Sequence, residues 1–182
     1  KERPEMSMEP VFSLEDEYTG EKIGSKLERV REVMKENGCN AHVLSSLDDI
    51  AWLLNIRGND IAYCPLVLSY AIVYNNSVEL FADIRKFSDD IINLLAENQV
   101  KIYPYEDIYR KVSEMTSEDK LLLDSAIMNY SLYQAISKET VIVDKQNPEI
   151  LMKSVKNETQ AENLRKAHLK DAVAHTKFMY WL

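Results

Sequence analysis

Short apolar segments alternate with amphipathic ones along most of this chain, and that alternation constrains its fold more than any other feature. Apolar runs bounded by turn residues predict strands. A hairpin is expected where Asn75-Asn76 separates two of these runs. Strands separated by helices, plus one hairpin, predict an α/β fold in which a mixed β-sheet is flanked by helices. The expected strands are 41–44, 67–74, 78–81, 100–103, 121–124 and 141–144, and the expected helices are 21–37, 48–55, 88–98, 106–115 and 130–137.

Single residues mark where several helices begin and end. Asn37-Gly38 closes the first long helix, with Gly38 suited to the left-handed position that follows a helix. Ser88 is expected to cap the helix that follows it. Asn157 and Gln160 fit a variant of the capping box, so a last helix is expected from near residue 157 to the end of the chain.

Composition describes an ordinary globular protein. Of 182 residues, 46% are hydrophobic and 29% are charged, which is enough for one domain with a full core. The net charge is −8 and there is no dense Lys/Arg stripe, so nucleic acid is not an expected partner. The apolar runs are too short for a membrane span. Cys39 and Cys64 are expected to be free thiols in a reducing cytoplasm.

Three regions are predicted along the chain. Residues 1–20 contain Pro4 and Pro10 and are expected to form an extended arm or interdomain linker. The α/β domain is expected over 21–156, and residues 157–182 are expected to form a helix truncated before another domain. The last eleven residues of that helix are apolar around most of its circumference, a pattern normally found in buried helices.

The segment LDDIAWLLNIRGNDIAYCP, residues 47–65, combines a buried helix with a charged turn. Asp48 is expected to cap the helix and Asn55 to end it. The turn that follows carries Arg57 and Asp60, and a loop positioned by a rigid element is a common place for function. The alternative is that Arg57 and Asp60 form a solvated turn pair of little energetic value.

This segment resembles the corresponding block of Xaa-Pro aminopeptidases, also called aminopeptidase P. The resemblance is to the middle, non-catalytic domain of the long three-domain members, a creatinase/prolidase N-terminal-like fold whose sheet is related to that of ribonuclease H. Cys64-Pro65 departs from the Asn-Pro that is common in related sequences, which puts the geometry of this loop in doubt. Three further blocks agree: YTGEKIGSKLERVREVM (18–34), SYAIV (69–73) and KNETQAENLRKAHLKDAVA (156–174).

The resemblance implies a parent metallopeptidase that removes an N-terminal residue preceding proline. Such enzymes use two divalent metal ions, commonly manganese, held by aspartates, a histidine and glutamates of a C-terminal catalytic domain that this sequence lacks. No catalytic or metal-binding residue is therefore assigned here, and the segment alone is expected to be inactive. The implied partners are the N-terminal and catalytic domains of the parent chain, a peptide substrate bound by the parent, and a second copy in a homodimer.

The candidate site residues follow from these two lines of reasoning. Arg57 and Asp60 are expected to form a structural turn or to line a substrate entrance, and His168 and Trp181 to contact another domain. His168 and His175 share a helix face with an acid between them, but they lie about 10.5 Å apart along the axis at about 1.5 Å per residue. A surface or interdomain stripe is therefore favoured over a metal site.

Two other classes of function stay open. A free-standing ligand-binding or interaction module would use Arg57 to hold a carboxylate through two hydrogen bonds. A metal-dependent nuclease would use acids that follow short strands, and Asp83, Asp124 and Asp144 occupy such positions. Acids after strands also commonly cap the next turn, and the acidic net charge disfavours the nuclease.

Overall fold

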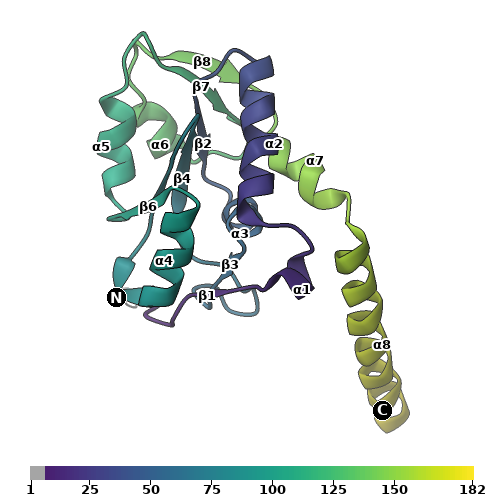
Figure 1. Cartoon of the computed structure of the whole chain (residues 1–182). Coiled ribbons are helices and arrows are strands. Elements are labelled where there is room, and N and C mark those ends of the chain that lie inside the picture. Colours follow the sequence, from purple (N-terminus) through teal and green to yellow (C-terminus); the bar gives the residue numbers. More distant parts are fainter. Residues whose placement is uncertain (1–6) are drawn as a thin grey trace.

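A six-stranded mixed sheet forms the centre of the protein, as seen in a computed structural model that describes residues 7–182 (Figure 1). The strands are β2 (Ala41–Leu44), β4 (Tyr70–Tyr74), β5 (Val78–Phe81), β6 (Val100–Tyr103), β7 (Lys120–Leu123) and β8 (Val141–Asp144). Their order is β6-β5-β4-β2-β7-β8. The pairs β2–β4 and β4–β5 are antiparallel, whereas β5–β6, β2–β7 and β7–β8 are parallel. The predicted α/β fold with a mixed sheet is confirmed.

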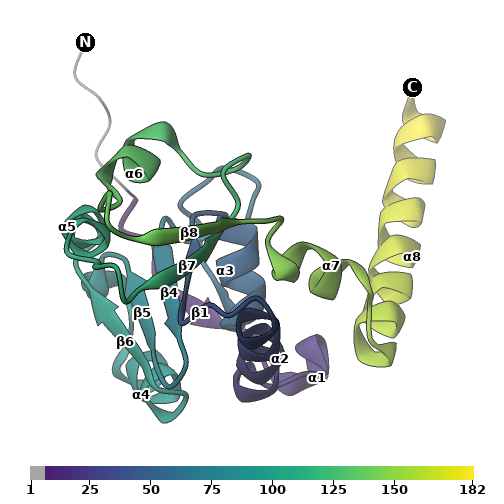
Figure 2. The same cartoon turned by 90° about the horizontal axis from the view of Figure 1, so that it is seen from above.

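Helices cover both faces of this sheet (Figures 1 and 2). One core lies beneath α2 (Ile23–Glu36), α3 (Leu47–Leu53) and α4 (Asp89–Glu97). The other lies beneath α5 (Asp107–Ser113) and α6 (Tyr130–Ala135). Strand β2 contributes side chains to both cores, because Val43 faces the second core and Leu44 faces the first. Both faces are covered, so the strands are mostly apolar, although β5 and β6 each include one charged residue, Glu79 and Lys101.

Local signals placed most element boundaries correctly. Ser88 caps α4 by accepting a hydrogen bond from the backbone N–H of Ile91, as predicted. Gly38 adopts φ +66° after α2, also as predicted. The start of α3 is a correction: Ser46 occupies the N-cap position, and Asp48, the predicted cap, lies in the first turn, where it accepts a hydrogen bond from the Ser46 hydroxyl.

The segment before α2 contacts the domain. Its first six residues lie outside the described part of the chain. Beyond them, Val11 is buried, and β1 (Phe12–Ser13) pairs antiparallel with β3 (Ile56–Arg57). The single turn α1 (Asp16–Thr19) follows and ends at Gly20, which has φ +64°. Pairing and burial attach residues 11–19 to the domain.

Two helices complete the chain. The first is α7 (Pro148–Ser154), which contacts α2 and α3, and the second is α8 (Glu158–Trp181). Asn157 and Gln160 form the predicted capping box at the start of α8. The far half of α8 projects away from the sheet, and none of its residues is buried (Figures 1 and 2). The burial predicted for its apolar end is therefore not present within residues 7–182, where Trp181 is 78% exposed.

No helix in the described residues is long and apolar enough to cross a membrane.

Candidate functional site

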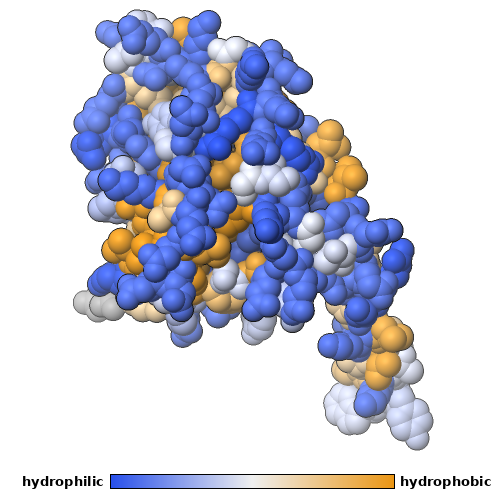
Figure 3. All heavy atoms as spheres, viewed as in Figure 1, coloured by the Kyte–Doolittle hydropathy of each residue, from blue (hydrophilic) through white to orange (hydrophobic). Residues whose placement is uncertain are grey.

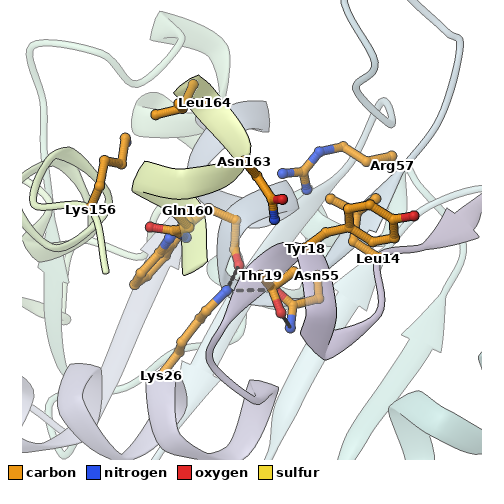
Figure 4. Close-up of a pocket in the computed structure, with 11 residues that line it drawn as sticks. Leu14, Tyr18, Thr19, Lys26, Asn55, Arg57, Lys156, Gln160, Asn163 and Leu164 are labelled. Atoms are coloured by element: carbon orange, nitrogen blue, oxygen red, sulfur yellow. Dashed lines mark hydrogen bonds between the residues drawn. The ribbon is translucent and has the colours of Figure 1, made fainter. Parts of the chain in front are cut away.

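A cavity of about 330 Å³ lies at the base of α8, where this helix approaches α1 and the C-terminal end of α3 (Figure 4). It contains Arg57, one of the residues singled out in the sequence. The other lining residues come from segments far apart in the chain: Leu14, Tyr18, Thr19, Lys26, Trp52, Asn55, Lys156, Gln160, Asn163 and Leu164. The structure therefore places Arg57 in the wall of a cavity that is open to solvent.

The backbone at Asn55 positions Arg57. Asn55 has φ +51°, a left-handed conformation that asparagine tolerates, and this turns the chain from the end of α3 into β3. The Nη1 group of Arg57 then donates hydrogen bonds to the carbonyl oxygens of Ala51 at 2.6 Å and Ile56 at 2.8 Å. Burial lowers the pKa of Arg57. The guanidinium thus stabilises the last turn of α3, where unpaired carbonyls carry partial negative charge.

Lys26 reaches the same helix end from α2. Its residue is 1% exposed, and its Nζ donates to the Trp52 carbonyl at 2.7 Å and to Asn55 Oδ1 at 2.5 Å. The ammonium also lies 4.6 Å from the centre of the Trp52 ring. Burial lowers the pKa of Lys26 to about 8; Glu21 opposes the shift, and Arg57 adds to it.

Asp60 lies in a different environment from Arg57. Its carboxylate is fully buried, accepts a hydrogen bond from the Leu68 backbone N–H at 2.7 Å, and forms an ion pair with the buried Lys86. The solvated Arg57–Asp60 pair considered from the sequence is therefore wrong. Asp60 instead fastens the loop that follows Arg57 to the short 3-10 helix η1 (Ile84–Lys86).

The candidate residues on α8 do not converge on this cavity. His168 is exposed, and Trp181 lies near the far end of the helix with its ring centre 6.1 Å from that of Phe178. Their contact with another domain stays a prediction. Among residues 7–182, no group of three or more histidines, cysteines or acids could hold a metal ion, so the donor set here does not fit a metal centre.

The acids that follow strands accept hydrogen bonds from backbone N–H groups in turns. Asp83 accepts a hydrogen bond from the backbone N–H of Arg85, and Asp144 accepts one from that of Ser125. Asp124 accepts one from the backbone N–H of Ala126. The contacts of Asp83 and Asp124 match the alternative in which the acids cap the following turn, whereas Asp144 binds the turn that follows β7.

Sequence reasoning missed a second buried polar cluster, beneath α7. His42 on β2 is fully buried, with Nδ1 3.0 Å from the Leu122 carbonyl and Nε2 3.2 Å from Glu149 Oε2. Nearby, the buried Asp49 accepts hydrogen bonds from Asn147 at 3.0 Å and Lys153 at 2.5 Å. A histidine inside the apolar run of β2 was the available signal, because a buried imidazole needs partners.

Comparison with known proteins identifies the family. The profile of the creatinase/prolidase N-terminal domain matches residues 2–160. The chain belongs to this family. This creatinase/prolidase N-terminal domain is 36% identical, over its whole length, to Xaa-Pro aminopeptidase 1 of Dictyostelium discoideum, of which it covers 29%. It is 33% identical to Xaa-Pro aminopeptidase 2 of Mus musculus, covering 100% of this chain and 28% of the relative.

Solved structures agree. The crystal structure of the X-prolyl aminopeptidase of Caenorhabditis elegans, described as a cytosolic enzyme with a di-nuclear active site, superposes with a TM-score of 0.88 at 32% identity. That match covers 99% of this chain and 30% of the enzyme. An Xaa-Pro dipeptidase of Bacillus anthracis, at 14% identity and a TM-score of 0.60, shares the fold over 87% of this chain and 44% of its own. This creatinase/prolidase N-terminal domain thus spans about 30% of the length of the aminopeptidases it matches.

Proposed function

We propose that this chain is the non-catalytic middle domain of a metal-dependent Xaa-Pro aminopeptidase, whose parent chain removes the N-terminal residue preceding proline from peptides. The observation that carries the proposal is similarity along the whole chain, at 36% and 33% identity, to proteins named Xaa-Pro aminopeptidase. Two divalent metal ions, manganese in the proposal, belong to a catalytic domain outside this chain. The parent is proposed to act in the cytoplasm, and a homodimer is part of the same proposal.

Within the parent, the domain is proposed to act in assembly and to shape substrate access. The far end of α8 supports an assembly role, because Phe178, Met179 and Trp181 are each more than half exposed. Figure 3 shows orange and pale atoms at the surface of this projecting helix end. Large apolar side chains gathered on an exposed helix end typically mark a contact surface. Asn157 and Asn163 donate hydrogen bonds to the carbonyl oxygens of Thr19 and Glu17, so contact with α1 fixes the base of α8 on the folded domain.

The test compares the purified chain with the full-length parent. With a peptide that begins Xaa-Pro and with manganese present, the chain alone is expected to show no hydrolysis, whereas the parent hydrolyses the peptide under the same conditions. Circular dichroism and cooperative urea unfolding of the chain provide the control that it is folded. Turnover by the pure chain, or a parent without Xaa-Pro activity, would contradict the proposal.

A further inference from the structure

The cationic side chains of Arg57, Lys26 and Lys156 reach the cavity at the base of α8, and no carboxylate lines the cavity to neutralise them. Arg57 and Lys26 both line the cavity, and none of its lining residues is acidic. The nearby Glu21 is held by Arg29 at 2.9 Å instead. The C-terminal end of α3 offsets only part of the charge, since a helix dipole is equivalent to about half an elementary charge. The residues that line the cavity therefore carry a net positive charge.

Arg57 also keeps hydrogen-bond donors available. Within residues 7–182, the bonds of its guanidinium come from Nη1, which donates to the Ala51 and Ile56 carbonyls. A guanidinium carries five N–H groups, so those on Nε and Nη2 remain for another acceptor. Figure 4 shows the group directed across the cavity toward Asn163. Two adjacent N–H groups match the two oxygens of a carboxylate.

Apart from Lys156, whose Nζ donates to the Lys153 carbonyl, the rest of the wall is apolar or neutral. Leu14, Trp52 and Leu164 line the cavity together with the amide side chains of Gln160 and Asn163. A volume of about 330 Å³ suits a small molecule. The apolar wall favours a ligand with one acidic group and an apolar remainder over a multiply charged phosphate, whose extra charges would have few partners.

We infer that this cavity binds the carboxylate of a small apolar molecule through Arg57, with the buried charge of Lys26 adding to the attraction. The inference does not depend on the proposed role of the domain in the parent, because the cavity is built only from residues of this chain. The carboxylate of the ligand lies against the Nε and Nη2 edge of the guanidinium. The apolar part of the ligand lies against Trp52 and Leu164.

A matched pair of probes tests the charge requirement. N-acetyl-L-phenylalanine carries the carboxylate, and N-acetyl-L-phenylalanine amide has the same shape without the charge. Calorimetric titration is expected to show binding of the acid and at least about tenfold weaker binding of the amide, because a hydrogen bond to a charged group is lost. In NMR spectra, the indole N–H of Trp52 is expected to shift on titration, whereas that of the exposed Trp181 stays in place.

Gln160→Glu tests the cavity without disturbing the fold. Gln160 Oε1 accepts the Asn157 backbone N–H in the capping box, and glutamate keeps this acceptor. The new carboxylate occupies the cationic cavity, so affinity for the acid is expected to fall at least about tenfold. Ala172→Glu is the matched control: it adds the same charge to an exposed position of α8 about two turns beyond Leu164, the last lining residue, and should leave affinity unchanged.

Several results would overturn the inference. They are equal binding of acid and amide, absence of binding by the unmodified chain, sulfate binding as tight as that of the acid, or a Gln160→Glu variant with undiminished affinity. Arg57→Met is expected to abolish binding as well. Arg57 also donates a hydrogen bond to the Ala51 carbonyl of α3, so this variant can lose binding because the fold changes. The result is therefore interpreted together with that of Gln160→Glu, whose fold is maintained.

Discussion

Lys26 shows what a single buried charge does to this domain. Its pKa of about 8 lies below the usual 10.5 because burial disfavours the charged form. Between these two values, the unfolded chain binds a proton that the folded chain has released. The free energy of unfolding contributed by Lys26 therefore rises as pH increases through this window.

Lys26→Met isolates this effect. Unfolding in urea is expected to show that the unmodified chain gains about 2 kcal/mol relative to the variant between about pH 7.5 and about pH 10. Other groups titrate in both proteins and cancel in the difference. A difference that stays constant with pH would contradict a depressed pKa for Lys26.

His42 gives the opposite sign. Burial lowers its pKa, but the attraction and hydrogen bond of Glu149 outweigh burial, so the net shift is upward from 6.5. The stabilisation is fully present below about pH 6.5 and is lost as pH rises through the folded pKa. Glu149→Gln is expected to cost about 3 kcal/mol, because it breaks a fully buried pair. Urea unfolding should show a larger loss at about pH 5.5 than at about pH 8.5; an equal loss at both values would exclude this coupling.

The partners of the buried Lys26 and of the buried Glu149 were not predictable from local sequence. Lys26 has its partners 26 and 29 positions away, at Trp52 and Asn55, and Glu149 meets His42 across 107 positions. A lysine within an amphipathic helix is ordinarily a surface residue. Only the arrangement of α2, α3 and α7 decides which charged side chains become enclosed.

At the scale of elements, two glycines offer a matched comparison. Gly20 and Gly38 both have positive φ, +64° and +66°. A Cβ atom on Gly20 would lie 2.6 Å from Asn157 Oδ1, whereas one on Gly38 would have nothing within 4 Å. Asn157 begins α8 and donates to the Thr19 carbonyl at 2.9 Å, so Gly20 permits the close approach of α1 and α8.

Gly38→Ala is expected to cost about 1 kcal/mol, the penalty of the left-handed conformation alone. Gly20→Ala should cost at least about 1 kcal/mol more, because Asn157 must also move. Urea unfolding measures both, and hydrogen exchange should show loosening of the first turn of α8 only in Gly20→Ala. Equal losses in the two variants would mean that the contact with α8 carries no energy.

Helix ends were the most predictable elements because their signals are local. Ser88, Gly38 and the Asn157–Gln160 box each satisfy backbone groups within a few residues. The start of α3 was misplaced because Ser46 and Asp48 are both good capping residues two positions apart. Arg57 was predicted from the sequence to be a position of interest, but the cavity that it lines was not predicted.

At the scale of the whole molecule, order is expected to decline along α8. Its first turns contact α1, whereas beyond them the helix has no buried residue in the described chain. Short helices without tertiary packing are marginal in water. Amide hydrogen exchange should therefore be fast over 170–182 and slow over α2, whose apolar face is buried. Similar protection of both segments at low protein concentration would contradict this expectation.

The walls of the Arg57 cavity come from both ends of the described chain, at 14–19 and 156–164, and from the middle, at 52–57. Closing so long a loop carries an entropic cost that local contacts do not repay early in folding. The cavity is therefore a late product of folding, present only in molecules in which all three segments have docked. A carboxylate ligand bound there would stabilise the fully folded state by mass action. The fraction of folded chains would therefore rise with the concentration of that ligand.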